Sequence, residues 1–329
     1  MNQDPNRFRI ELTVSCVDCA SIPKVGGAGK IFEEAGTQYQ LMHNGLRVIS
    51  GGYHGGWMSE IIERLEGHHE PQEEVIFHEI LRHVGPAATM VELGGFWSYY
   101  SLWFLRGFEE RRAVVLEPDP SHLAVGRANA SLNGAARIEF VQGSVGAVSA
   151  GPQPFPTETS GTLEIPEFAV TDILAGREIG VLDILHCDTQ GAETSVIASC
   201  EALFKARKIR FGIFSTHAYQ ISGDALTHQK CLSMLKDFGG QILAEHDVHE
   251  SFSGDGLIAV YFGAEPLAWN APKLSFNRYS NGIFRNPIYD LAEAQQALRL
   301  APQPAPPPAA PQALTELGPK SLLSRLFAR

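Results

Sequence analysis

Short apolar runs alternate with longer amphipathic segments over residues 89–262 of the chain. Short runs that end in turn-forming residues are typical of buried strands, whereas the longer segments have the helical period. The predicted strands are 89–92, 113–116, 137–141, 182–187, 209–215, 241–245 and 257–262, and the clearest helices between them are 120–132 and 226–238. Strands that alternate with helices at this spacing predict an α/β fold with a doubly wound, mostly parallel sheet.

The segment before this pattern differs in kind. Residues 8–52 alternate apolar and polar positions between turn signals. Within them, runs 38–41 and 46–49 flank H-N-G, a hairpin signal because Asn and Gly accept positive φ. We therefore expect a β-rich N-terminal appendage, followed by helices over 57–65 and from Pro71 to about residue 84.

Three further stretches lack the core pattern. Residues 151–161 are rich in turn formers and predict an excursion on the surface. Residues 301–311 predict an extended polyproline-type linker, and 320–329 place apolar side chains opposite basic ones, as in a short helix that docks on a membrane surface or a protein partner. The expected organisation is an N-terminal appendage and cap (1–70), the main α/β domain (71–270), a C-terminal extension (271–300), and the linker with its basic amphipathic tail (301–329).

Composition narrows the classes of function. The 329 residues are 44% hydrophobic, which suffices for a full core, and the formal net charge is -11. A strongly negative chain is not expected to bind nucleic acid, because neutralising phosphates needs a basic surface. Neither a long apolar run nor a secretory signal is apparent, so we expect a soluble cytoplasmic protein.

The chain has five cysteines, an odd number that argues against a disulfide framework. Cys16 and Cys19 form a lone C-x-x-C without the second pair that a zinc ribbon requires. Plain thiols are the favoured interpretation, with zinc binding and redox chemistry as the alternatives.

Residues 89–120 form one predicted β-turn-α-β unit around which the rest is organised. Gly94 and Gly95 permit a tight turn and close approach of the backbone to a ligand, and the following helix presents free N–H groups to an anion. Glu117 ends the second strand, where a carboxylate can accept hydrogen bonds from both hydroxyls of a ribose. The unit therefore predicts a nucleoside-cofactor site.

The turn itself distinguishes between cofactors. A dinucleotide site needs G-x-G-x-x-G, whereas here Phe96, Trp97 and Ser98 follow the first pair of glycines. Glu92, just before the glycines, would repel a phosphate but could hold an ammonium group. An amine, a carboxylate and a ribose together favour S-adenosylmethionine over NAD.

Polar residues from distant parts of the sequence are predicted to meet at one edge of the sheet. In doubly wound sheets, ligands bind beyond the carboxyl ends of the strands. Glu92, Glu117, Asp188 and His217 each stand at such an end, and Ser144, just past the third strand, is placed to meet an adenine edge. We expect these side chains to share one crevice.

Three motifs carry a family resemblance. Residues 92–101 read E-L-G-G-F-W-S-Y-Y-S, 117–120 read E-P-D-P with N-A-S-L-N at 129–133, and 183–193 read D-I-L-H-C-D-T-Q-G-A-E. In combination they resemble the FkbM-type family of S-adenosylmethionine-dependent methyltransferases, whose motifs run D-x-G-A-N-x-G-Y-Y-S, E-P-N-P with N-x-x-L-N, and D-x-x-K-I-D-x-E-G-A-E. The resemblance covers about residues 90–262.

The resemblance implies a class I methyltransferase (Rossmann-like) fold and methyl transfer to a hydroxyl of a sugar, glycolipid or secondary metabolite. It implies S-adenosylmethionine as the cofactor, with its methionine part at Glu92 and Gly94, its ribose at Glu117 and its adenine near Ser144. Gly95, Ser98 and Asp188 are the further residues expected to contact the cofactor. Two departures stand out, because Ser98 replaces the last glycine of the first motif and Phe96 replaces its asparagine.

The residue that accepts the hydroxyl proton is predicted from position. Asp188 and His217 end adjacent strands, and an imidazole titrates near neutrality whereas a carboxylate needs its pKa raised. His217 is therefore the expected base and Asp188 the group that orients it or the acceptor.

Several alternatives stay open. A divalent metal is not expected, with Asp188, His246 and His249 as the residues that could hold one. His68, His69 and Glu70 are candidates for metal or acceptor contacts, against solvated imidazoles at a capped helix entry. The rival functions are a cofactor-binding protein without turnover and a nicotinamide-dependent oxidoreductase, and a homo-oligomer is compatible with each.

Overall fold

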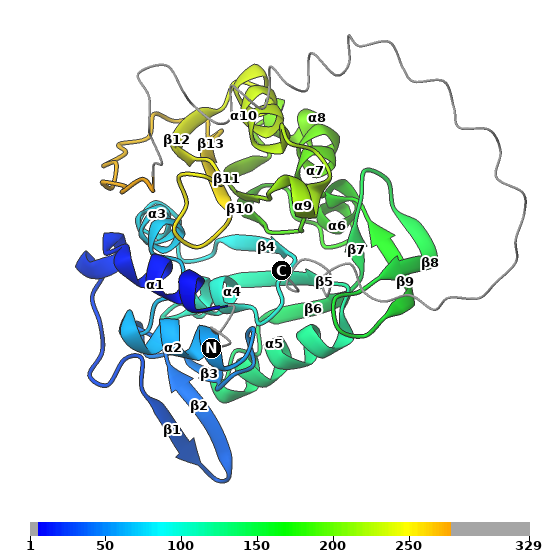
Figure 1. The fold of residues 1–329 in the computed structure, drawn as a ribbon. Helices are drawn as coiled ribbons and strands as arrows, with labels where there is room; N and C mark the ends of the chain where they lie inside the picture. The colour runs from blue at the N-terminus through cyan, green and yellow to red at the C-terminus, as the bar shows by residue number, and fades with distance from the viewer. Residues whose placement is uncertain (1–5, 278–329) are drawn as a thin grey trace, which may run out of the picture. The chain divides into compact units, whose positions relative to one another are not determined.

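Seven strands form the central sheet of the computed structural model, which describes residues 6–277. Their order across the sheet is β12 (Gln241–His246), β13 (Gly256–Tyr261), β11 (Ile209–Thr216), β10 (Leu182–Cys187), β4 (Thr89–Leu93), β5 (Arg112–Glu117) and β6 (Ile138–Gln142) (Figure 1). The pairs from β11 to β6 are parallel, and β13 is antiparallel to both of its neighbours. The doubly wound, mostly parallel sheet predicted from the sequence is thus confirmed.

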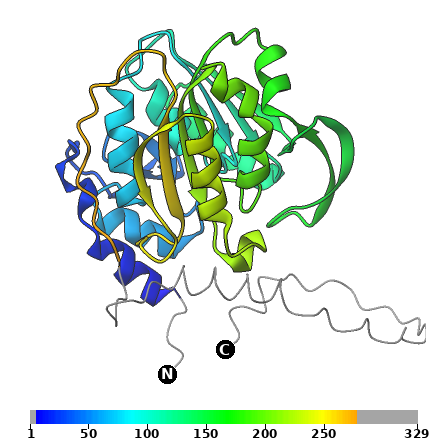
Figure 2. The ribbon, with the colours of Figure 1, turned by 90° about the horizontal axis from the view of Figure 1, so that it is seen from above.

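Helices cover both faces of this sheet (Figure 2). Side chains of strand β4 point into two separate buried clusters, one on each face of the sheet. Met90 packs into the first cluster, and Val91 and Leu93 pack into the second. The first cluster includes residues of α2 (Gly56–Arg64), α3 (Pro71–Leu81), α4 (Tyr99–Leu105) and α5 (Pro120–Leu132), and the second includes residues of α6 (Val170–Ala175), α7 (Glu193–Ser199), α8 (Glu201–Lys205) and α10 (Thr227–Asp237). The short helix α9 (Tyr219–Ser222) follows β11. Since both faces of the central strands are buried, these strands read as continuous apolar runs in the sequence.

The N-terminal region is only partly the β-rich appendage that was expected. Strands β1 (Ile31–Glu34), β2 (Thr37–Leu41) and β3 (Arg47–Ile49) form an antiparallel sheet, and the hairpin predicted around H-N-G is confirmed as β2 and β3. The chain before them is instead helical, in α1 (Arg7–Ser15) and the 3-10 turn η1 (Asp18–Ser21). Burial of Ile10 and Thr13, one helical turn apart, outweighs the local alternation there.

Two asparagines attach this appendage to the main domain. The side-chain oxygens of Asn133 and Asn129 accept hydrogen bonds from the backbone N–H groups of Arg47 and Ile49 at 2.9 and 2.7 Å. Asn129 also donates to the carbonyl of Trp97 at 2.9 Å. The N-A-S-L-N motif therefore has a structural role, since it pairs the free edge of β3 with α5.

The predicted surface excursion at 151–161 is a further small sheet. Strands β7 (Ser144–Val145), β8 (Ala150–Pro156) and β9 (Thr162–Phe168) form it, with β8 and β9 as an antiparallel hairpin. Residues 151–161 are mostly exposed, as expected of a surface excursion, and the prolines of β8 stand in an edge strand, which tolerates them.

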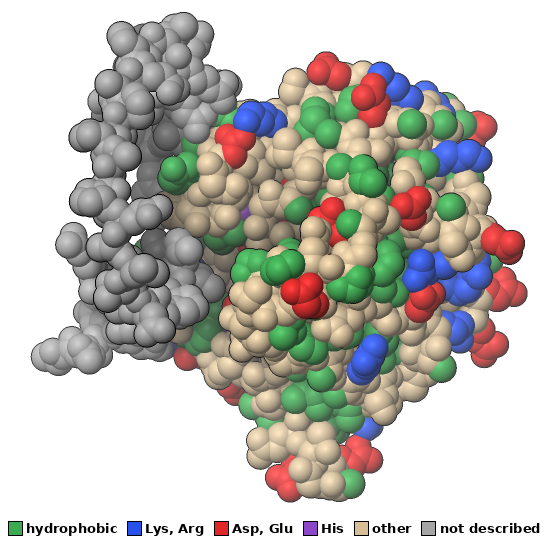
Figure 3. Space-filling model, turned by 90° about the vertical axis from the view of Figure 1, so that its right-hand side faces the viewer, with side chains coloured by type: hydrophobic (Ala, Val, Ile, Leu, Met, Phe, Trp, Pro, Cys, Tyr) green, Lys and Arg blue, Asp and Glu red, His purple; other side chains and the backbone are tan. Residues whose placement is uncertain are grey.

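Two predictions for the C-terminal part, the linker at 301–311 and the tail at 320–329, lie outside the described residues. Within residues 6–277, no helix combines the length and apolar character needed to span a membrane. On the face shown in Figure 3, the basic side chains of the described residues stand singly or in small groups among acidic ones.

Candidate functional site

A cavity of about 460 Å³ lies beyond the carboxyl ends of β4, β5, β6 and β10. Of the residues that the sequence proposed for the site, Glu92, Gly94, Gly95, Glu117, Ser144 and Asp188 line it. Ser98, His217, His246 and His249 do not. The walls that sequence reasoning missed come from the β8–β9 hairpin, from Tyr53 and His54 before α2, and from Asp119 and His122 at the start of α5.

The turn after β4 is packed against neighbouring strands and requires glycine. A Cβ on Gly94, whose φ is +76°, would stand 1.8 Å from the carbonyl oxygen of Asp188, and one on Gly95 would stand 2.2 Å from Val115. Phe96 and Ser98 also have positive φ, at 33° and 61°. The resembled family has Asn and Gly at these two positions, which are the residues that accept this conformation most readily. In this chain the turn therefore has positive φ at two positions, Phe96 and Ser98, whose residue types adopt that conformation less readily than Asn or Gly.

Glu117 is fixed by backbone donors. One carboxylate oxygen accepts from the N–H of Phe96 at 3.0 Å and the other from the N–H of Asp119 at 2.9 Å. His122 lies 3.6 Å from the same carboxylate. Because each oxygen has a second lone pair, the side chain can still accept hydrogen bonds from a ligand in the cavity.

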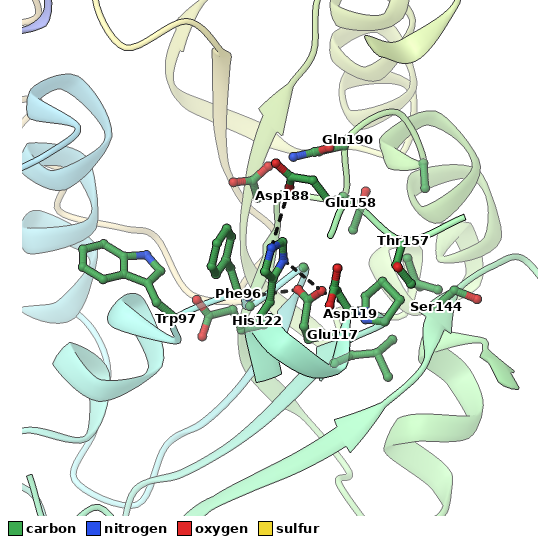
Figure 4. A pocket seen from close by; sticks show the side chains of 18 of the residues that line it. Phe96, Trp97, Glu117, Asp119, His122, Ser144, Thr157, Glu158, Asp188 and Gln190 are labelled. Carbon is green, nitrogen blue, oxygen red and sulfur yellow. Dashed lines mark hydrogen bonds and ion pairs between the residues drawn. The ribbon is translucent and has the colours of Figure 1, made fainter. Parts of the chain in front are cut away.

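Asp119 connects the cavity to the β8–β9 hairpin. Its carboxylate accepts from the N–H of Ser121 at the start of α5 and from the N–H of Thr159 in the hairpin, at 3.0 and 2.7 Å. Nearby, the rings of Phe96 and His122 stack with centroids 3.5 Å apart, and Figure 4 shows them beside Glu117 and Asp119. The hairpin, predicted to be a mere excursion, is thus tied to the site.

Two polar groups of the cavity lack a protein partner that would satisfy them. The hydroxyl oxygen of Ser144 is buried without a hydrogen bond. Glu92 is buried and accepts from the N–H of Ser101 at 3.2 Å, and burial raises the pKa of its carboxyl to about 7 against the opposing charge of His186. A ligand that offers a hydrogen-bond partner to the hydroxyl of Ser144 and a cation to the carboxyl of Glu92 would suit both groups.

His69 and Glu70 form a buried ion pair at the cavity wall, 3.2 Å apart. Burial disfavours the charged ring of His69, but Glu70 and Glu74 outweigh it and raise the pKa of His69 to about 10. The phenol of Tyr100 donates to Glu70 at 2.9 Å. The expectation of solvated imidazoles at this helix entry is wrong, because His68 and His69 are both inside the protein and both contact Glu74.

His217 lies behind the cavity wall among three carboxylates. Its Nδ1 is 3.0 Å from Glu193, and its Nε2 is 3.1 Å from Asp188 and 3.6 Å from Asp255. Burial would lower the pKa of the ring, but Asp255, Asp188 and Glu193 raise it well above 6.5. The expectation that this imidazole titrates near neutrality is therefore wrong, and as a cation it has no free lone pair for a proton.

The candidate metal ligands do not gather. Asp188, His246 and His249 are not a group whose ligand atoms lie within 4.8 Å of one another, and within residues 6–277 the one such group is His43, His68 and Glu74. In that group the rings of His43 and His68 are stacked at 14°, Nδ1 of His43 lies 3.2 Å from the carbonyl oxygen of Pro23, and Nδ1 of His68 contacts Glu74.

The cysteines are buried and free, including Cys16 and Cys19. Burial raises the pKa of the Cys16 thiol to about 12, which keeps it protonated and unreactive at neutral pH.

Comparison with known proteins gives matches to solved structures alone. No family model and no curated protein matches the chain. The precorrin-6y C5,15-methyltransferase of Geobacter metallireducens GS-15 is 14% identical with a TM-score of 0.37, over 57% of this chain and 87% of that one. M. capricolum TrmK with S-adenosylhomocysteine is 10% identical with a TM-score of 0.37, over 57% and 67%, and the METTL16 methyltransferase domain is 14% identical with a TM-score of 0.40, over 58% and 68%. Because these TM-scores are low, the fold is assigned from the order of the strands in the central sheet.

That order places β4 and β10 at the centre and inserts the antiparallel β13 between β11 and β12. The fold is a class I methyltransferase fold. In this methyltransferase fold the cavity occupies the edge where doubly wound sheets bind their ligands. The FkbM-type resemblance remains a prediction that rests on the three motifs.

Proposed function

We propose that the cavity binds S-adenosylmethionine and that the protein transfers a methyl group to a hydroxyl of a sugar, glycolipid or secondary metabolite. The observation that carries this proposal is the charge of the cavity. None of the described residues that line it is Lys or Arg. Neighbouring acids raise the pKa of two lining imidazoles, His69 and His186, but carboxylates outnumber them, namely Glu70, Glu92, Glu117, Asp119, Glu158 and Asp188. S-adenosylmethionine carries a sulphonium and an ammonium group, so it is among the few nucleoside cofactors that such a cavity attracts.

The polar groups of the cavity fit the parts of this cofactor. Glu92 would hold the ammonium group. Burial disfavours the ionised form of this carboxyl in the free protein, and the ammonium group would stabilise that form in the complex. Glu117, already oriented by two backbone N–H groups, would accept hydrogen bonds from the ribose hydroxyls. The unpartnered hydroxyl of Ser144 would meet the adenine. The cavity volume of about 460 Å³ is within the range of small-molecule sites, about 300–1,000 Å³.

A nicotinamide dinucleotide fits less well. Its pyrophosphate would lie at the turn after β4, beside Glu92 and without a Lys or Arg among the described lining residues. The N–H of Phe96, which a phosphate would need there, already donates to Glu117. The repulsion of like charges in a buried site disfavours this rival.

When bound, S-adenosylmethionine supplies a methyl group whose bond to sulphur breaks with the electron pair remaining on sulphur, as the acceptor oxygen forms the new bond to carbon. Asp188 lines the cavity and is about one-third exposed, so it can accept the proton of the attacking hydroxyl. That proton becomes strongly acidic as the new bond forms, so a carboxylate suffices as base. His217 contacts Asp188 on the side away from the cavity, and Glu193 in turn contacts the other nitrogen of His217.

Calorimetry with S-adenosylmethionine, S-adenosylhomocysteine and NAD tests the cofactor. We expect binding of the first two and none of the third; binding of NAD alone would overturn the proposal. Incubation with radiolabelled S-adenosylmethionine and a panel of sugars and glycolipids then tests transfer. Tight cofactor binding with no methylated product from any hydroxyl acceptor would favour a binding protein without turnover.

A further inference from the structure

Glu92 and His186 stand side by side at the carboxyl ends of two neighbouring strands. They are register partners in the parallel pair of β4 and β10. Such partners point to the same face of a sheet, on strands about 4.8 Å apart. Both side chains are buried, at 3% and 2% exposure, and both line the cavity. One small group of a ligand can therefore reach the carboxylate and the imidazole together.

One nitrogen of the His186 ring is paired within the protein and the other is not. Nε2 lies 2.7 Å from Glu73, whose second carboxylate oxygen accepts from the hydroxyl of Ser215 at 2.9 Å. Nδ1 is buried without a hydrogen-bond partner among the described residues. Burial disfavours the charged form of this ring, but Glu73, Glu92 and Asp188 outweigh it and raise its pKa to about 9. At neutral pH, Nδ1 therefore carries a proton, and a buried N–H group requires an acceptor.

Other donors that an anion could use in this part of the cavity are already paired. In the turn after β4, the N–H groups of Gly94 and Gly95 donate to the carbonyl of Leu116 at 2.9 and 3.2 Å. The N–H of Phe96 donates to a carboxylate at 3.0 Å, and His69 has a carboxylate at each ring nitrogen. Lys and Arg are absent from the described lining residues. The unpaired imidazole N–H on β10 is thus the charged donor that lies next to the carboxylate on β4.

We propose that Glu92 and His186 together bind the amino-acid part of S-adenosylmethionine, with the ammonium group at Glu92 and the carboxylate at Nδ1 of His186. This inference rests on the proposed function and adds the residue that recognises the carboxylate of the cofactor. The ammonium and carboxylate groups are attached to the same carbon atom, so an anion and a cation on adjacent strands match them. The ligand would supply the acceptor that Nδ1 lacks and the cation that suits Glu92, whereas a phosphate would bring no cation.

Three ligands of different charge test the inference by calorimetry. S-adenosylhomocysteine carries both groups, its decarboxylated analogue carries the ammonium group alone, and methylthioadenosine carries neither. The first variant combines Glu73→Gln with His186→Leu, because loss of the imidazole alone would leave Glu73 buried and unpaired. The second, His186→Gln, removes the charge and keeps an amide donor for Glu73. The matched control combines Glu245→Gln with His228→Leu, since these two residues form a pair at 3.0 Å outside the cavity lining.

Wild-type protein should bind S-adenosylhomocysteine at least about tenfold more tightly than the decarboxylated analogue, as one charge-assisted hydrogen bond provides. Both His186 variants should lower this ratio at least about threefold, because the charged donor is lost, and should keep their affinity for methylthioadenosine. The control should keep the wild-type ratio. A wild-type ratio near one, or a ratio that survives in both His186 variants, would overturn the inference and leave the proposed function standing. If none of the three ligands bound the wild type, the proposed function would be overturned together with the inference.

Discussion

The two ends of the cavity hold their carboxylates in opposite ways. At the Glu117 end, both carboxylate oxygens accept from backbone N–H groups, with the imidazole of His122 farther off at 3.6 Å, and Asp119 is held by N–H and hydroxyl donors. At the Asp188 end, each acid pairs with an imidazole, Glu70 with His69, Glu73 with His186 and Asp188 with His217, and Glu70 and Glu73 also accept from hydroxyl groups.

This difference separates a fixed part of the site from an adjustable one. Backbone donors keep their charge and position at every pH, so the Glu117 end is preorganised for a ligand that never changes, such as the nucleoside of a cofactor. Carboxylate–imidazole pairs depend on protonation and on each other, so the Asp188 end responds to what binds there. We expect changes at the first end to act on cofactor affinity and changes at Asp188 and Asp255 to act on turnover, acceptor choice and pH dependence.

The largest effect is expected from Glu117→Ala. Charge-assisted hydrogen bonds to the two ribose hydroxyls are worth roughly 1.5–3 kcal/mol each, so the loss of both corresponds to an affinity for S-adenosylmethionine that is about a hundredfold to ten-thousandfold lower. Calorimetry measures it, with Glu164→Ala, an exposed carboxylate of β9, as the control. The melting temperature should also fall, because Phe96 and Asp119 lose the acceptor of their N–H groups. Unchanged affinity would remove Glu117 from the cofactor site.

Asp188→Asn should act on turnover instead. The amide keeps the shape of the side chain but cannot take a proton, so kcat should fall about 100-fold while cofactor affinity changes less than about threefold. His249→Ala, exposed and outside the cavity lining, should leave kcat unchanged. If kcat fell equally in His249→Ala and added magnesium restored it, the hypothesis of a divalent metal at Asp188, His246 and His249 would be supported. The contrast between the two ends of the cavity would then not hold.

Ionisation of Asp255, which contacts His217 at the Asp188 end, should make the free energy of unfolding depend on pH. Its folded pKa is raised from 3.8 to about 7, so its contribution to the free energy of unfolding is fully present below 3.8 and is lost as pH rises to about 7. The slope is at most about 1.4 kcal/mol per pH unit, and less here because solvent screens a carboxyl that is one-third exposed. Urea midpoints from pH 4 to 8 should therefore decline less steeply in Asp255→Asn. Parallel curves for the two proteins would show that this carboxyl titrates normally.

The smallest effect is expected from Ser144→Ala at the preorganised end. One neutral hydrogen bond to adenine is worth about 0.5–1.5 kcal/mol, so affinity for S-adenosylmethionine should fall about two- to tenfold. Ser98→Ala is the matched control, because its hydroxyl is also buried without a partner but lies outside the cavity lining. If both variants lose affinity equally, the effect comes from packing rather than from a contact with the cofactor.

The sequence by itself determined the framework of this protein. Continuous apolar runs predicted the strands of the central sheet, and β10 and α5 begin and end at the predicted residues. Local signals were enough for this, because a strand buried on both faces and a helix between a proline and Asn-Gly are encoded within a few neighbouring positions. The same reasoning placed Glu92, Glu117, Ser144 and Asp188 at one edge, and all four line the cavity.

What decided the chemistry of the site was tertiary structure. The charge of His217 depends on Asp188, Glu193 and Asp255, and the last of these is far along the chain and had no signal of its own. For the hairpin that meets Asp119, the sequence predicted only an excursion on the surface, because its edge-strand prolines are turn formers in isolation. Protonation and burial depend on which distant groups surround a side chain, and local residue patterns do not encode that neighbourhood.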